Sequence, residues 1–79
     1  MAETVLVVDS DRARRGRLQA MLSGFGYHAA AAADAAGALQ AVSEASPKVL
    51  LVDGSLPGVD LPEFVRRIKR RSRRAELLV

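Results

Sequence analysis

The sequence predicts an α/β fold of three layers, α/β/α, in which a parallel sheet lies between helices. Two short apolar runs, Val5–Val8 and Val49–Val52, stop abruptly at polar residues, which is typical of strands buried on both faces of a parallel sheet. Segments with apolar residues at helical spacing alternate with these runs, and short turn-like stretches connect them. The expected order is β-α-β-α-β-α-β, with right-handed crossovers.

The first half of the chain is expected to form a strand, a helix and a second strand. After the strand at Val5–Val8, Ser10 or Asp11 can cap a helix that Gly24 and Gly26 end. Apolar residues at helical spacing are Leu18, Met21, Leu22 and Phe25, and the arginines Arg12, Arg14, Arg15 and Arg17 are expected on the outer face. Residues 27–33 carry five alanines, which favour helix, but their place between two helical patterns predicts a short strand at a sheet edge.

The second half repeats the alternation. Asp34 is expected to cap a helix that Pro47 stops, with its apolar face formed by Ala38, Leu39 and Val42. The strand at Val49–Val52 leads into GSLPG, which has the composition of a tight turn. Asp60 then caps a helix that has Pro62 at its start and that buries Phe64, Val65 and Ile68. Residues 76–79 (ELLV) are predicted as a fourth strand.

Composition limits the class of protein. A chain of 79 residues forms one domain, here residues 1–79, with a thin core. The absence of cysteine excludes disulfides and thiolate metal sites, and the single histidine, His28, excludes histidine-rich metal sites. No apolar stretch approaches the ~20 residues that span a bilayer, and the first residues lack the pattern of a signal peptide. A cytoplasmic location without membrane contact is therefore expected.

Polar residues follow two of the predicted strands at their carboxyl ends, where ligands bind in parallel sheets. Asp9 and Ser10 follow the first strand, and Asp53 follows the third. If these strands are neighbours, the two carboxylates and a loop carbonyl suit a divalent cation such as Mg²⁺. An aspartate beside such an ion can accept a phosphoryl group. The alternative is that each aspartate only caps the helix that follows it.

Four segments resemble the receiver domain of bacterial response regulators: VLVVDSD, Leu18-x-x-x-Leu22 with GY, PKVLLVD, and D-x-x-LPGVD from Asp53 to Asp60. The resemblance implies a flavodoxin-like fold with strand order 2-1-3-4-5, the fifth strand being absent here. It implies that Asp53 is the phosphoacceptor and that a sensor histidine kinase or phosphotransfer protein is the donor. It further implies a weak Mg²⁺ site at Asp9, Asp53 and the backbone carbonyl of Ser55. Such a domain is a signalling module and not an enzyme.

The chain departs from the family pattern in three places. Ser10 stands where the family has its second pocket acid, so this metal position is weakened by the loss of one charge. Leu61 stands where a glycine is expected after Asp60. The family runs to a greater length, so residues 1–79 are expected to be a truncated domain that lacks the C-terminal third, including the switch Ser/Thr and the Lys that contact the phosphoryl group.

Other functions compete with phosphorylation. A pseudo-receiver would keep the fold as a protein-protein interaction module that does not depend on phosphate, which the serine at position 10 favours. Nucleic-acid binding through the basic run at residues 66–74 is less favoured, because helical spacing spreads these charges and no aromatic residue lies among them. The edge of the fourth strand is expected to support a homo-oligomer.

Overall fold

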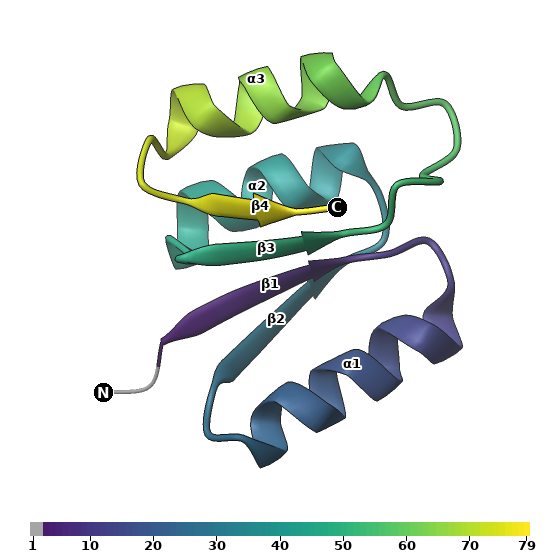
Figure 1. The fold of residues 1–79 in the computed structure, drawn as a ribbon, viewed down its shortest axis with the longest axis vertical. Coiled ribbons are helices and arrows are strands. Elements are labelled where there is room, and N and C mark those ends of the chain that lie inside the picture. Colours follow the sequence, from purple (N-terminus) through teal and green to yellow (C-terminus); the bar gives the residue numbers. More distant parts are fainter. Residues whose placement is uncertain (1–2) are drawn as a thin grey trace.

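The computed structural model describes residues 3–79 of the chain. Strands and helices alternate along them, and the four strands point the same way in Figure 1. The strands are β1 (Thr4–Val8), β2 (His28–Ala32), β3 (Val49–Val52) and β4 (Glu76–Leu78). The helices are α1 (Arg12–Gly24), α2 (Ala35–Ala45) and α3 (Leu61–Arg71). The predicted order of seven elements is confirmed.

One parallel sheet holds the four strands in the order β2-β1-β3-β4. β1 is central: Val8 lies opposite Ala32 of β2 on one side and opposite Val52 of β3 on the other. β4 pairs with β3 alone among the described residues, from Val49↔Glu76 to Leu51↔Leu78. The α/β class and the flavodoxin-like strand order predicted from the sequence are confirmed.

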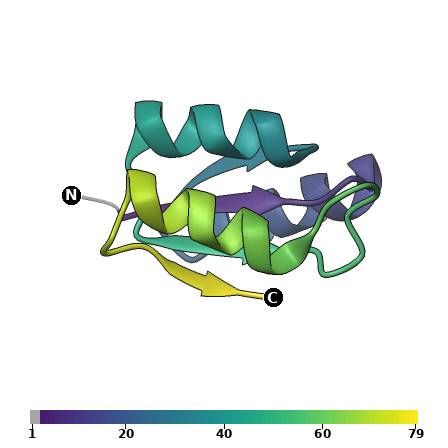
Figure 2. The same cartoon turned by 90° about the horizontal axis from the view of Figure 1, so that it is seen from above.

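The two faces of the sheet are covered unequally. α2 and α3 pack side by side on one face of the sheet (Figures 1 and 2). Alternate residues of β1 and β3 contribute to the main core formed with these two helices. Its fully buried members include Leu6, Leu50 and Ile68. On the opposite face α1 packs on β1 and β2, and no residue of α1 is fully buried. The α1 side therefore contributes less apolar burial to stability.

Aspartates begin all three helices, as predicted. The side chain of Asp11 accepts hydrogen bonds from the N–H groups of Ala13 and Arg14, Asp34 accepts from Gly37, and Asp60 accepts from Glu63. These bonds satisfy backbone donors that the first turn of a helix leaves unpaired. Because α1 begins directly after β1, its capped first turn lies at the carboxyl end of that strand.

Several details differ from the sequence-based expectations. β2 is His28–Ala32 and not 27–33, and β4 ends at Leu78 and not Val79. Phe25 lies beyond the end of α1 and is 74% exposed, and Met21 is 52% exposed, so neither belongs to the core. For Phe25 the reason is that the helix ends before it: its N–H bonds back to the carbonyls of Met21 and Leu22, after which Gly26, at φ 92°, turns the chain.

Candidate functional site

The loops after β1 and β3 lie at the same end of the sheet (Figures 1 and 2). Asp9 directly follows β1, and Asp53 directly follows β3, which is the neighbour of β1. The N–H of Asp53 donates to the carbonyl of Val8 at 2.8 Å, so the pairing of the strands continues to the site. The parallel topology thus brings the two predicted carboxylates to one edge of the sheet.

Asp9 is the one buried charged residue in the described chain, with 4% of its surface exposed. Its Oδ1 accepts from the N–H of Asp11 at 2.9 Å and from Nη2 of Arg14 at 2.9 Å, and its Oδ2 accepts from Nε of Arg14 at 2.5 Å. The hydrogen bond from Arg14 is the main cause that holds the pKa of Asp9 below its usual value, against the opposing effect of burial. Asp9 is therefore a buried, ionised carboxylate.

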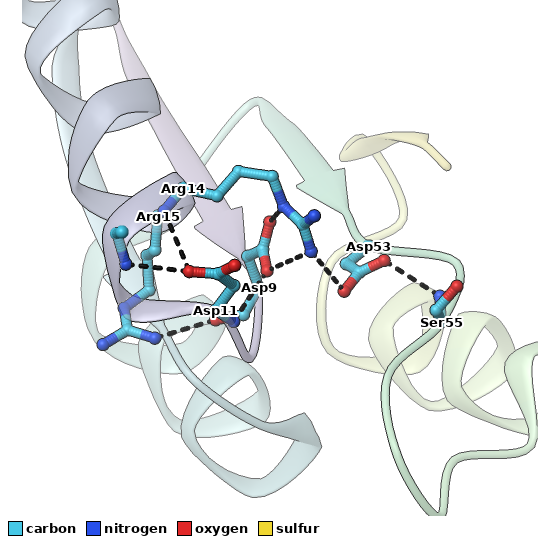
Figure 3. A network of polar contacts seen from close by, with 7 residues as sticks. Asp9, Asp11, Arg14, Arg15, Asp53 and Ser55 are labelled. Atoms are coloured by element: carbon cyan, nitrogen blue, oxygen red, sulfur yellow. Dashed lines mark hydrogen bonds and ion pairs between the residues drawn. The ribbon is translucent and has the colours of Figure 1, made fainter.

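Arg14 joins the two strand ends (Figure 3). Its Nη2 also donates to Oδ2 of Asp53 at 3.1 Å, so one guanidinium bridges both carboxylates. The same two acids raise the pKa of Arg14, with the hydrogen bond to Asp9 as the largest cause. Arg14 is exposed, as predicted, but its contact with the two acids was not predicted: the first turn of α1 lies close enough to the end of β1 for this side chain to reach back over the site.

Asp53 differs from Asp9 in its surroundings. Its side chain is 15% exposed, compared with 5% for that of Asp9. Oδ1 accepts from the N–H of Ser55 at 2.9 Å, and Oδ2 accepts from Arg14, so the carboxylate is held in one orientation at the surface of the pocket (Figure 3). Asp53 is therefore a positioned carboxylate that is partly exposed, and more so than Asp9.

The residues that follow Asp9 form the turn between β1 and α1 and the start of that helix. Ser10 is exposed, and the side chain of Asp11 is engaged as the cap of α1. Arg15 donates from Nη1 to the backbone carbonyl of Asp9 at 2.9 Å and thus fixes the turn between β1 and α1. Asp11 therefore does not replace the missing acid at position 10.

The oxygen atoms at the site are of the chemical type that a hard divalent cation binds. Two carboxylates, Asp9 and Asp53, and the carbonyl of Ser55 offer oxygen ligands, which Mg²⁺ prefers. Residues 3–79 hold no group of three or more acidic, histidine or cysteine side chains that could bind a metal. The position between the two carboxylates is taken by the guanidinium of Arg14. Two of the predicted Mg²⁺ ligands, Asp9 and Asp53, thus lie together, while the ion and its contacts with Ser10 and the Ser55 carbonyl stay predictions.

The basic run at residues 66–74 is divided between a helix and the segment that follows it. Residues 66–71 belong to α3, whereas residues 72–74 lie between α3 and β4. Glu63 pairs with Arg66 at 3.3 Å and with Arg67 at 3.9 Å, and Nζ of Lys69 donates to the carbonyl of Ala75. Several of these charges are thus paired with groups on α3 or just after it, and nucleic-acid binding through this run stays an untested alternative.

A parallel sheet with a buried aspartate after β1 and an accessible one after β3 defines a receiver-like signalling domain. The family model described as response regulator receiver domain matches residues 5–79. The chain belongs to this family, whose members act in two-component systems, generally bind Mg²⁺ and interact with histidine kinases or phosphotransfer proteins.

Curated relatives agree with the family. Transcriptional regulatory protein AfsQ1 of Streptomyces coelicolor is 34% identical over 67 residues, which are 85% of this chain and 30% of the relative. Response regulator MprA of Mycobacterium tuberculosis is 36% identical over 69 residues, which are 87% of this chain and 30% of the relative. The chain therefore spans under a third of the length of these relatives.

Solved structures agree with the fold. Chemotaxis response regulator CheY4 of Vibrio cholerae superposes with a TM-score of 0.85 at 26% identity, over 98% of this chain and 66% of that one. The receiver domain of NtrC4 from Aquifex aeolicus gives 0.83 at 30% identity, over 98% of this chain and 64% of that one. In the described residues, no helix is long and apolar enough to cross a membrane.

Proposed function

We propose that this receiver domain accepts a phosphoryl group on Asp53 from the phosphohistidine of a sensor histidine kinase or phosphotransfer protein. The observation that carries the proposal is the contrast between the two acids at the sheet edge. Asp53 is partly exposed and held in place by Ser55 and Arg14, whereas Asp9 is buried and accepts three hydrogen bonds. Asp53 is the carboxylate that a donor in solution can reach.

The transfer is a displacement at phosphorus. A carboxylate oxygen of Asp53 forms a bond to phosphorus, the phosphorus–nitrogen bond of the donor breaks, and the imidazole leaves with that electron pair and takes a proton from solvent. The nucleophile and the donor are both anionic, so cationic charge at the site lowers the barrier. Arg14 brings one such charge to Oδ2 of Asp53, and Mg²⁺, held by Asp9, Asp53 and the Ser55 carbonyl, would supply more when bound.

Labelling with a small phosphodonor tests the assignment. The protein is incubated with an acyl phosphate and Mg²⁺, and its intact mass is measured before and after treatment with hydroxylamine, which cleaves acyl phosphates. One phosphoryl group is expected on the unaltered chain and on Asp60→Asn, which alters an exposed cap away from the pocket. Asp53→Asn is expected to take up none. Label that persists in Asp53→Asn would show that the phosphoacceptor is another residue.

A second candidate is a pseudo-receiver that binds a partner protein without phosphate. The observations that favour it are the neutral, exposed Ser10 and the ion pair that Arg14 makes with Asp53. Binding of a partner kinase by the unphosphorylated chain, at an affinity that Asp53→Asn leaves unchanged, would select this function. For either function we propose a cytoplasmic protein in which residues 1–79 belong to one receiver domain that does not act as an enzyme.

A further inference from the structure

The pocket at the ends of β1 and β3 holds a cation of its own. Asp9 and Asp53 contribute two negative charges, and the guanidinium of Arg14 bonds to both of them at 2.9 and 3.1 Å through one nitrogen, Nη2. A second nitrogen, Nε, bonds to the other oxygen of Asp9 at 2.5 Å. Arg14 thus makes a two-pronged contact with the buried acid and reaches the accessible one with the same planar group (Figure 3).

We infer that Arg14 is the resident counter-ion of this pocket and competes with a divalent cation for it, so that the metal binds only when the guanidinium leaves the two carboxylates. The inference deepens the proposed function, because it concerns the site at which phosphoryl transfer is proposed. It makes Arg14 a residue that sets the affinity of the receiver for divalent ions.

Geometry and charge both require the competition. Nη2 bonds to Oδ1 of Asp9 and to Oδ2 of Asp53, so a cation held by these same oxygens would need the space that the guanidinium fills. A guanidinium and a divalent ion at such a separation also repel each other strongly. The neutral side chain of Ser10 strengthens the competition. A carboxylate at position 10 would add a third negative charge, which would remain available to a metal while Arg14 balanced part of the charge of Asp9 and Asp53.

The Arg14 side chain is able to leave without unfolding the domain. It is 48% exposed, and it comes from the first turn of α1, a helix that has no fully buried residue. Its displacement therefore opens no hole in the main core, which lies on the other face of the sheet under α2 and α3. Two arrangements follow: a closed pocket with Arg14 inside, and an open pocket that admits the ion.

Titration with Mg²⁺ alone, followed by the amide NMR signals of Asp11 and Ser55, tests the competition. Arg14→Gln is expected to lower the dissociation constant for Mg²⁺ at least ten-fold relative to the unaltered chain. The matched control is Arg17→Gln, which removes an exposed charge from the same helix and is expected to change the constant less than two-fold. Equal affinity in Arg14→Gln and the unaltered chain, or no Mg²⁺ binding in either, overturns the inference.

A second measurement uses the unaltered chain and so does not depend on the folding of a variant. The Nε–H signal of Arg14, which Arg14→Lys removes, is expected to lose its hydrogen-bonded shift in step with the Mg²⁺-induced change at Ser55. If the Ser55 amide titrates while the Arg14 signal stays constant, the ion and the guanidinium share the pocket and the inference is wrong. Neither measurement involves phosphate, so a failed labelling of Asp53 leaves this test unaffected.

Discussion

Ile68 anchors α3 on the sheet, and α3 follows the loop that carries Asp53 and Ser55. It is fully buried, and it lies in the core between α3 and the sheet. Shortening it to alanine removes three carbon atoms, worth ~2.4 kcal/mol at about 0.8 kcal/mol each, and leaves a cavity that adds to the loss. We therefore expect Ile68→Ala to lower the free energy of unfolding by about 3 kcal/mol, and Ile68→Val by about 1 kcal/mol.

A loss of this size is a large part of the free energy of unfolding of so short a chain, since domains are stable by roughly 0.05–0.15 kcal/mol per residue. Urea unfolding followed by circular dichroism measures it: with an m-value near ~1.5 kcal/mol/M, the midpoint of Ile68→Ala is expected to fall by about 2 M. The exposed control Met21→Ala should shift the midpoint by under ~0.5 M, because Met21 is 52% exposed. Equal midpoints for Ile68→Ala and Met21→Ala would refute the packing assigned to α3.

Three further predictions follow from the site and the sheet edge. The pKa of Asp9 is depressed, chiefly by the hydrogen bond from Arg14, so ionised Asp9 stabilises the fold above the ordinary pKa of 3.8 and this stabilisation is lost as the pH falls below 3.8. Asp9→Asn should therefore flatten the decline of the urea midpoint over that acid range. An unchanged decline would contradict the ion pair. Ser10→Asp is expected to strengthen Mg²⁺ binding about ten-fold, because one added charge–metal contact is worth ~1–2 kcal/mol after desolvation; NMR titration checks this, and equal affinities would place position 10 outside the pocket. The 79-residue chain is expected to form dimers or larger assemblies by strand addition at β4, whose outer edge has no strand partner among the described residues; light scattering over a concentration series that shows a monomer throughout would contradict this.

The sequence was sufficient to predict the strands at the centre of the sheet and the two acids at their ends. β1 and β3 are runs of branched apolar residues that end in aspartate, so pattern and chemistry agree. Their neighbouring places in the sheet were implied by the resemblance to receiver domains and are confirmed by the structure. The bounds of β2 were less certain, because alanine is small and favours helix, and tertiary pairing with β1 decides its structure.

The role of Arg14 could not be obtained from helical spacing. Periodicity places it with three other arginines on the solvent side of α1, and it gives no information on how the first turn sits over the end of β1. One signal was present: a carboxylate at the end of a buried strand requires a cation nearby, and Arg14 is five positions after Asp9. For Met21 and Phe25, helical spacing predicted a place on the buried apolar face of α1, but both side chains are exposed.

The central place of β1 has a consequence for the order in which the domain folds. Both of its neighbours run parallel to it, and each is reached only through a helix, so no pair of strands is joined by a hairpin. On the ribosome β1 emerges first, yet it stays without a partner until His28–Ala32 and then Val49–Val52 have been synthesised. Folding therefore has to close long loops before any strand pairs, which slows it and leaves the apolar residues of β1 exposed to other chains for longer.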